Sequence, residues 1–252
     1  MHQPSLERFE VDGLSMIVDP DARTRGLVVA FTDRLGGVSP APYASLNLGR
    51  LTGDDARNVD ANRDRVAHAL GLDPRHIHRI RQVHGTRVVD RWGLPDGAAV
   101  EEADGIAIEG EGAAMVLAAD CVPMVVSGAN ALVALHAGWR GLVAGAVGAA
   151  VSKAGPGAVA WVGPSIRACC YEVGPEVIGA FERAGLPVVD ESHVDPGRAA
   201  ADALGAAGVS SVTAWDECTC CATVGGPGSG PRFFSHRRDG VTGRQAGLVW
   251  LG

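Results

Sequence analysis

Short apolar runs and amphipathic runs alternate along the chain, and they predict strands and helices respectively. Apolar runs of four to eight residues bounded by glycine, proline or polar residues are typical of buried strands. We expect strands at residues 11–18, 27–32, 76–82, 86–90, 105–108, 114–118, 159–162, 209–214 and 248–251. Helical spacing, with capping residues or a following glycine, predicts helices at residues 54–70, 142–153, 175–184 and 196–207.

The order of these elements predicts the fold class. Strands outnumber helices, hairpins mix with helical crossovers, and no linker divides the chain. A length of 252 residues is enough to bury a substantial core. We therefore expect a mixed α/β (α+β) fold, a single domain over residues 1–252 with mixed β-sheets flanked by helices.

Residues 118–145 read as two short strands joined by a turn, then a glycine-marked loop and a helix. If Gly128 and Ala129 form a two-residue type II′ turn, Cys121 lies directly opposite His136. Opposed residues of an antiparallel pair have Cβ atoms about 4.5–5.5 Å apart, so the thiolate and the imidazole would converge. A three-residue turn would shift the register by one and remove this pairing.

His84, in a predicted turn or strand end, extends this pair to a possible metal site. Two histidines and a cysteine suit a borderline-soft ion such as Zn²⁺, with a fourth position left for water or substrate. Asp120 is then expected to hydrogen-bond one imidazole. In a metal-free alternative, Cys121 is a nucleophile whose thiolate is stabilised by His136. A core thiol beside ordinary turn histidines is the third possibility, and residue types alone do not separate the three.

Charge and hydropathy exclude several classes of partner. The formal net charge is −7, and basic residues form small groups rather than a stripe that could follow a nucleic acid. No apolar run approaches the ~18 residues of a membrane span. Residues 1–10 lack the charged-then-apolar pattern of a signal peptide. We expect a cytoplasmic protein with no nucleic-acid or membrane partner, in which the six cysteines are reduced.

Three further groups invite a metal interpretation. Cys169-Cys170 and Cys218-Thr219-Cys220-Cys221 look like thiolate clusters, but neither has the two C-x₂-C pairs of a closed zinc site. We expect both to be structural. His76-Ile77-His78 is one His-X-His pair, far fewer than a multicopper centre needs, and predicts an ordinary strand.

Seven motifs carry a family resemblance. They are Thr-Asp-Arg-Leu-Gly-Gly-Val-Ser (32–39), Tyr-Ala-Ser-Leu-Asn-Leu-Gly (43–49), Gln-Val-His-Gly (82–85), Ala-Asp-Cys-Val-Pro (119–123), His-Ala-Gly-Trp-Arg-Gly (136–141), Cys-Tyr-Glu-Val-Gly (170–174) and Phe-Ser-His-Arg-Arg-Asp-Gly (234–240). In this order they resemble the laccase-domain family, also called polyphenol oxidase-like, peptidoglycan editing factor and purine nucleoside phosphorylase. The resemblance spans roughly residues 27–251.

The resemblance implies a mononuclear zinc site formed by His84, Cys121 and His136, which would also be the catalytic residues; copper is a possible substitute. It implies phosphate-dependent cleavage of adenosine, inosine and 5′-methylthioadenosine, with adenosine deamination as a side activity. The small-molecule partners would then be a nucleoside and phosphate. Two alternatives stay open: an amidase that edits peptidoglycan precursors with Cys121 and zinc, and a copper-dependent polyphenol oxidase.

Phosphorolysis also needs groups that hold phosphate against the anomeric carbon of ribose. Such positioning removes much of the entropic barrier, and arginine is suited to bidentate phosphate contacts. Asn47 and Arg140 lie in the motifs, and Arg63 lies near the apolar stripe of the predicted helix. We predict that these three residues bind phosphate or substrate.

Overall fold

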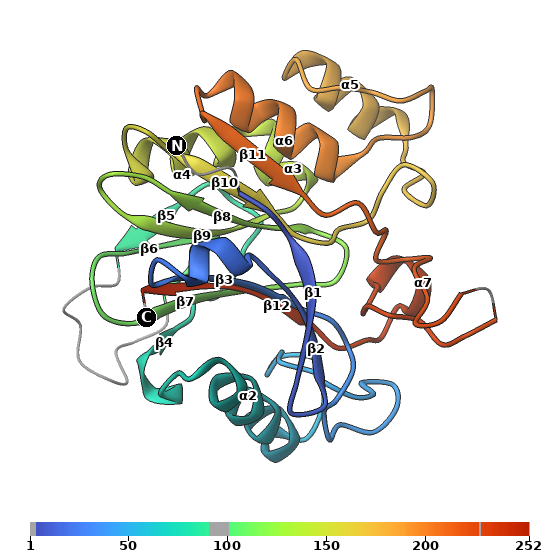
Figure 1. Ribbon diagram of the computed structural model, residues 1–252. Helices are drawn as coiled ribbons and strands as arrows, with labels where there is room; N and C mark the ends of the chain where they lie inside the picture. The colour runs from blue at the N-terminus through green and yellow to red at the C-terminus, as the bar shows by residue number, and fades with distance from the viewer. Residues whose placement is uncertain (1–3, 91–100, 227, 252) are drawn as a thin grey trace.

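Two β-sheets stack face to face at the centre of the protein, and helices cover both outer faces (Figure 1). The computed structural model describes residues 4–90, 101–226 and 228–251. The expectation about a signal peptide falls partly on residues 1–3, which lie outside these ranges. The first sheet has the strand order β1 (Glu7–Val11), β2 (Leu14–Val18), β3 (Leu27–Thr32), β12 (Gln245–Leu251), β7 (Ala113–Ala118) and β4 (Ile77–His78).

The second sheet also mixes parallel and antiparallel pairs. Its strand order is β11 (Ser211–Ala214), β10 (Val159–Val162), β8 (Val122–Ser127), β9 (Leu132–Ala137), β6 (Gly105–Ile108) and β5 (Val88–Asp90). β10 pairs with β11, and β5 with β6, in parallel, whereas β8 pairs antiparallel with both of its neighbours. The predicted mixed α/β fold with mixed sheets flanked by helices is confirmed.

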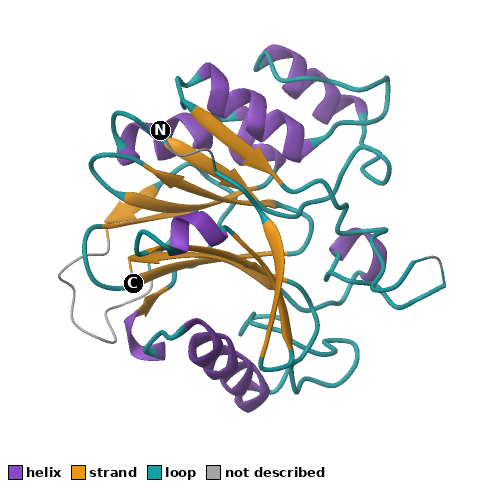
Figure 2. Ribbon diagram, in the orientation of Figure 1, coloured by secondary structure: helices purple, strands orange, loops and turns teal. Residues whose placement is uncertain are grey.

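The helices pack at different places around the two sheets. They are α1 (Pro20–Arg23), α2 (Ala56–Leu70), α3 (Trp139–Val143), α4 (Ala146–Ala154), α5 (Pro175–Arg183), α6 (Pro196–Ala206) and α7 (His236–Asp239), with a 3₁₀ turn at Pro74–His76. Five of them, α2 to α6, cover the two outer faces, whereas α1 packs at the level between the sheets and α7 lies to one side (Figure 1). Figure 2 shows α2 beneath the first sheet and α3 to α6 above the second. No helix in the described ranges has both the length and the apolar character that a bilayer span requires.

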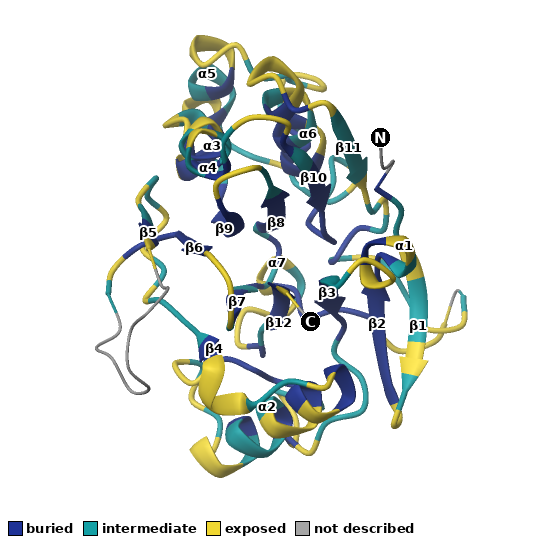
Figure 3. Cartoon of the chain, turned by 60° about the vertical axis from the view of Figure 1, so that its left-hand side comes forward, coloured by how far each residue is buried: buried dark blue, intermediate teal, exposed yellow. Residues whose placement is uncertain are grey.

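Burial of apolar side chains in three layers stabilises this arrangement. Between the sheets, Phe31 and Val249 of the first sheet pack with Ile106, Val125 and Trp161 of the second, and all are nearly fully buried. One further cluster lies between the first sheet and α2, and another between the second sheet and its helices (Figure 3). Burial of each large apolar side chain stabilises the folded state by about 1.5–3 kcal/mol. The two sheets therefore form a rigid framework that holds the loops at their edges in place.

Several predicted elements match the structure and others differ for local reasons. The strands at 27–32, 105–108 and 159–162 are confirmed to the residue. The run at 11–18 is instead a hairpin, because Asp12 and Gly13 both have positive φ and reverse the chain between β1 and β2. The helix predicted at 142–153 is two helices, since Gly145 (φ 87°) breaks the chain between α3 and α4. The strand predicted at 76–82 shortens to Ile77–His78.

The register predicted for the hairpin at 118–145 is wrong. Ser127 pairs with Leu132, and Pro123, not Cys121, lies opposite His136. The connection has four residues, because backbone N–H groups at its tip donate to the carbonyls of Ala154 and Pro156. The error equals two residues, which keeps every side chain on its predicted face. Cys121 and His136 therefore still face the same side.

Candidate metal centre

The two histidines and the cysteine predicted as ligands meet at one edge of the stacked sheets. His84 lies in the turn between β4 and β5, Cys121 in the connection from β7 to β8, and His136 in β9. Their ligand atoms all lie within 4.8 Å of one another. Cys121 Sγ is 3.9 Å from His84 Nε2. A sulfur and a nitrogen bound to one tetrahedral Zn²⁺ lie about 3.6 Å apart, so the observed distance is close to the one that zinc requires. His136 is buried, whereas His84 is exposed, so a fourth position would open towards solvent.

Asp104, immediately before β6 and fully buried, positions both histidines. Its carboxylate accepts the backbone N–H groups of Val83 (3.3 Å), His84 (2.9 Å) and Gly85 (2.6 Å). His136 Nδ1 donates to Asp104 Oδ1 over 2.9 Å, which leaves Nε2 of His136 for a metal. One carboxylate thus orients the His136 ring and fixes the turn that carries His84. Sequence reasoning missed Asp104, which stands in none of the motifs and is separated from Gly85 by 18 intervening positions.

Asp120 is not the imidazole partner that the sequence predicts. Its Oδ1 accepts the hydroxyl of Thr219 and its Oδ2 accepts the backbone N–H of Arg237, both at 2.7 Å. Asp120 has a φ of 94°, a conformation that costs a non-glycine residue free energy and needs support from its surroundings. These two bonds supply that support, so Asp120 holds the backbone that presents Cys121.

Two residues of the motifs shape the centre without offering a ligand. The side-chain amide of Gln82 donates to the carbonyl of Leu117 (2.7 Å) and accepts its N–H (2.8 Å), tying the turn of His84 to β7. A Cβ on Gly138 would lie 2.7 Å from His84 Cδ2 and 3.3 Å from Cys121 Sγ. Only glycine lets the start of α3 approach the two ligands this closely.

Cys121 and His136 shift each other's pKa in opposite directions. Although burial opposes it, the positive His136 and hydrogen bonds from both histidines lower the pKa of Cys121 to about 6. Burial lowers the pKa of His136, but the Cys121 thiolate and the Asp104 carboxylate outweigh it and raise that pKa to about 9. At neutral pH the metal-free centre therefore holds a thiolate beside an imidazolium. A metal ion that binds here finds Cys121 already ionised but has to displace the proton of His136.

Zinc binding at this centre is expected to release about one proton at pH 7.5. Cys121 is already ionised above about pH 6, whereas His136 keeps its proton until about pH 9, so the proton comes from His136. The affinity should rise about tenfold per pH unit between these values and level off above them. Calorimetry in two buffers of different ionisation enthalpy measures the proton count, and the difference between wild type and Cys121→Ala isolates this centre. A count near zero at pH 7.5 would contradict the assignment.

A hollow of about 420 Å³ opens at the metal centre. Besides the three ligand residues, it is lined by Leu51, Ile80, Arg81, Gln82, Leu117, Ala118, Ala119, His236 and Arg244. Ligand pockets commonly measure about 300–1,000 Å³, so the hollow can hold a small molecule. Its apolar side chains Leu51, Ile80 and Leu117 come from the first half of the chain, whereas His236 and Arg244 come from the segment around α7.

Arg244 is the half-buried cation of this hollow. Its Nη1 donates to the carbonyls of Thr242 (3.0 Å) and Gly243 (2.8 Å), and no carboxylate in the described ranges forms an ion pair with it. Burial lowers its pKa, while the negative Cys121 and Asp120 oppose that shift. A guanidinium held by carbonyls and facing a thiolate centre is suited to bind an anion. Sequence reasoning missed it, because Arg244 lies just outside the motif at 234–240.

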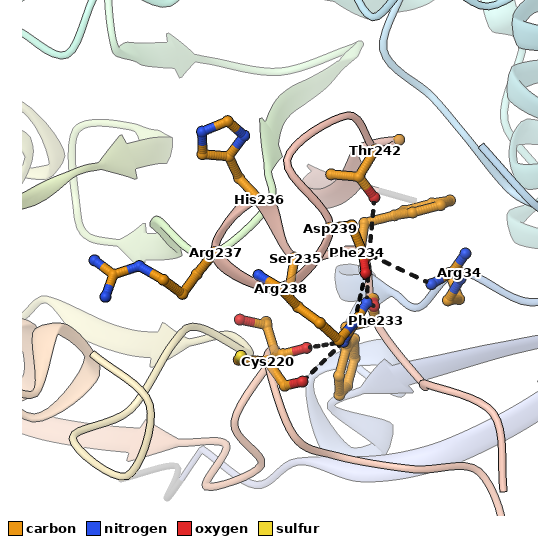
Figure 4. Close-up of polar contacts among 12 residues, drawn as sticks. Arg34, Cys220, Phe233, Phe234, Ser235, His236, Arg237, Arg238, Asp239 and Thr242 are labelled. Atoms are coloured by element: carbon orange, nitrogen blue, oxygen red, sulfur yellow. Dashed lines mark hydrogen bonds and ion pairs between the residues drawn. The ribbon is translucent and has the colours of Figure 1, made fainter. Parts of the chain in front are cut away.

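His236, the first residue of α7, is the second polar group from this segment. Its Nδ1 donates to the carbonyl of Gly240 over 2.7 Å, so Nε2 remains for a ligand. Figure 4 shows His236 pointing away from Arg238, which lies on the opposite side of the segment. Arg238 donates to the carbonyls of Thr219 (3.1 Å), Cys220 (2.9 Å) and Phe233 (2.8 Å). The motif at 234–240 therefore divides into a structural arginine and an exposed histidine.

The three residues predicted to bind phosphate lie outside the lining of the hollow. The Asn47 amide is fully buried; it donates to Thr52 Oγ1 (2.9 Å) and Asp54 Oδ2 (3.0 Å) and accepts the backbone N–H of Arg244 (2.9 Å). Arg63 donates twice to the carbonyl of Leu48, at 3.0 and 2.7 Å.

Arg140, in α3, is exposed, and its guanidinium stacks 4.4 Å from the ring centroid of Trp139. Direct phosphate binding by Asn47, Arg63 and Arg140 thus stays a prediction, one that these positions do not favour. The contact of Asn47 with Arg244 gives Asn47 a positioning role instead.

The fold and the site define a class of α/β proteins with two stacked sheets and one open His/Cys/His centre at their edge. The model of the family described as multi-copper polyphenol oxidoreductase laccase matches residues 28–252, and the chain belongs to this family. A purine nucleoside phosphorylase of Streptomyces griseus is 44% identical over 88% of this chain and 93% of its own length. The purine nucleoside phosphorylase YfiH of Escherichia coli is 34% identical, over 94% of this chain and 98% of its own length.

Solved structures agree with this assignment. YlmD from Geobacillus stearothermophilus superposes with a TM-score of 0.85 at 29% identity and covers 98% of both chains. A hypothetical protein YfiH from Bacillus licheniformis gives a TM-score of 0.83 at 27% identity over 97% of this chain and 99% of its own. The fold is therefore the one that these relatives share along their whole length.

Proposed function

We propose that this protein is a zinc-dependent purine nucleoside phosphorylase that cleaves adenosine, inosine and 5′-methylthioadenosine with phosphate. The observation that carries the proposal is one hollow in which an open His/Cys/His group lies beside the guanidinium of Arg244 and the imidazole of His236. The names of the relatives support the reaction class. The apolar wall formed by Leu51, Ile80 and Leu117 suits the face of a purine.

In the proposed reaction, a phosphate oxygen forms a bond to C1′ of ribose while the bond from C1′ to the purine N9 breaks. The electron pair leaves with the purine, and the proton that the attacking hydrogen phosphate gives up, passed through Nε2 of His236, neutralises it. Arg244 holds the phosphate, which converts an encounter of two reactants into a positioned reaction. Zn²⁺ held by His84, Cys121 and His136 would act as a Lewis acid or generate hydroxide near neutral pH. The second mode accounts for adenosine deamination as the proposed side activity.

The described part of the chain favours this function over a multi-copper oxidase. It contains one open group with histidine ligands, whereas electron transfer to oxygen through several coppers requires several such groups. His76-Ile77-His78, the one His-X-His pair of the sequence, lies at β4 and contributes nothing to the His84 group. Copper in place of zinc at a single centre remains chemically compatible with the same ligands.

Incubation of the purified protein with inosine and phosphate tests the proposal. Hypoxanthine and ribose 1-phosphate should form in equal amounts, and omission of phosphate should stop the reaction. Adenosine and 5′-methylthioadenosine belong in the same panel, with inosine formation from adenosine as the readout for deamination. No cleavage of any nucleoside, together with release of an amino acid from a muramyl peptide, would overturn the proposal in favour of the amidase. Phenol oxidation by the copper-loaded protein alone would favour the oxidase.

Replacing Arg244 by alanine is expected to raise the KM for phosphate about 10- to 100-fold, because a charge-assisted hydrogen bond contributes about 1.5–3 kcal/mol. The KM for inosine should change much less. Steady-state kinetics with phosphate and inosine varied in turn measures the two KM values. Arg198→Ala, which removes a largely exposed arginine from α6, is the matched control and should leave both constants unchanged. Equal effects on both substrates would contradict a phosphate role for Arg244.

A further inference from the structure

Four cysteines that the sequence places in two separate groups form one cluster in the structure. Cys169 and Cys170 lie in the turn after β10, and Cys218 and Cys221 lie in the segment after β11. The four sulfur atoms all lie within 4.8 Å of one another. The structural role predicted for both groups stays a prediction, and the structure adds that the two groups lie side by side. The C-x₂-C spacing of Cys218 and Cys221 is a signal in the sequence, but the other two cysteines are adjacent to each other and separated from Cys218 by 47 intervening residues.

The distances in this cluster match a tetrahedral thiolate site. Zn–S bonds of about 2.3 Å place the four sulfurs of a tetrahedral site about 3.8 Å apart. Cys169 Sγ lies 3.7 Å from Cys221 Sγ. In multi-iron clusters the cysteines bind different metal atoms, so such short separations among all four sulfurs favour a single ion. Four protein ligands leave no open position, in contrast to the His84 centre, which offers three.

The local backbone prepares the cluster for an ion. Cys218 is buried, and its Sγ accepts the backbone N–H of Arg167 at 3.4 Å, a bond that stabilises a thiolate. The two segments are also joined directly, because Ser165 and Cys218 form a parallel β-bridge and the N–H of Thr219 donates to the carbonyl of Ser165 over 3.0 Å. The sulfurs are thus brought together by backbone pairing that does not itself need the metal.

We propose that Cys169, Cys170, Cys218 and Cys221 bind one Zn²⁺ in a closed structural site, distinct from the centre formed by His84, Cys121 and His136. All donors are soft thiolates, which select zinc over the hard cations.

The position of this site gives it a structural task. Thr219, inside the Cys218–Cys221 segment, donates its hydroxyl to Asp120, which precedes the ligand Cys121. Arg238 donates to the carbonyls of Thr219 and Cys220 in the same segment (Figure 4). An ion that fixes this segment would hold both the Asp120 support of Cys121 and the α7 segment that presents His236. The proposal stands on the cysteine geometry alone and does not depend on the reaction catalysed at the first centre.

Metal analysis of protein purified under reducing conditions with zinc present tests the proposal. Native mass spectrometry should find two zinc ions per chain. Cys218→Ser/Cys221→Ser should lose one zinc and keep the one bound by Cys121, and the melting temperature should fall by at least about 5 °C. Cys220→Ser is the matched control: it removes a thiol from the same segment but not from the cluster, and should keep both ions.

Cobalt provides a spectroscopic readout that begins on the wild-type chain. One Co²⁺ bound to four thiolates gives sulfur-to-cobalt charge-transfer absorption well beyond that of the single thiolate at Cys121. This excess should persist in Cys121→Ala and disappear in Cys169→Ser, which alters an exposed member of the cluster. A single zinc that is lost completely in Cys121→Ala would overturn the proposal. So would one equivalent of iron in place of the second zinc, or a Cys169–Cys221 disulfide found by peptide mapping of the reduced preparation.

Discussion

Replacement of Cys121 by alanine is expected to remove one zinc ion per chain and to lower kcat/KM for inosine phosphorolysis about a thousand-fold or more. Cys121 provides the one thiolate of the centre, and the two imidazoles left behind make an incomplete ligand set. Loss of the metal removes several kcal/mol of transition-state stabilisation, which corresponds to this factor. Metal analysis and chromatography of released hypoxanthine measure the two effects on the same preparation.

The control for this result is Cys220→Ala, which also removes a partly buried thiol but lies outside both groups of metal-binding residues. It should retain the zinc content and the activity of the wild type. Full zinc occupancy in Cys121→Ala would show that the ligand assignment is wrong. Loss of activity with the zinc retained would instead favour a nucleophilic role for the thiolate.

Asp104→Asn is expected to weaken zinc binding about 10- to 100-fold, the usual effect of removing a hydrogen-bond partner of a ligating histidine. The amide cannot accept the three N–H groups of residues 83–85 and the Nδ1–H of His136 together, since one of its atoms is now a donor. Breaking this buried pair should also lower the free energy of unfolding by about 3–5 kcal/mol. A zinc competition titration and urea denaturation measure the two quantities.

A pH measurement separates this positioning role from a general loss of stability. Asp104 helps to raise the pKa of His136, so in Asp104→Asn the imidazole loses its proton at lower pH. Fewer protons should then be released when zinc binds at pH 7.5. Glu109→Gln makes the same chemical change on an exposed residue just beyond the other end of β6 and should alter none of these values. An unchanged proton count in Asp104→Asn would contradict the role.

The sequence could place His84, Cys121 and His136 in one candidate centre because each stands in a short motif with its own turn chemistry. The structure brings the potential ligand atoms of these three residues within 4.8 Å of one another. The register that first suggested the Cys121–His136 contact was nevertheless wrong by two residues. Side chains alternate between the two faces of a strand. A register shift of two residues therefore leaves Cys121 and His136 on the same face, and the two residues still meet.

Groups that act across long sequence separations could not be predicted in the same way. Asp104 binds His136 and the His84 turn, Asn47 binds the backbone of Arg244, and Cys169 meets Cys221. In each case the residue type is compatible with many partners, and only the packing of two sheets selects one. The phosphate candidates show the same limit, since an arginine such as Arg63 can bind a carbonyl as well as an anion.

By itself, therefore, the sequence determined the fold class, most strands and helices, and the three residues of the first centre, because periodicity and turn residues act over a few positions. The tertiary structure decided the hairpin register, the Asp104 support, the cations that face the hollow and the union of the four cysteines. These depend on how the β7–β8 crossover, the α7 segment and the turns after β10 and β11 meet at the edges of the two sheets. Such contacts arise from the burial of shared apolar faces, which no local stretch of the chain encodes.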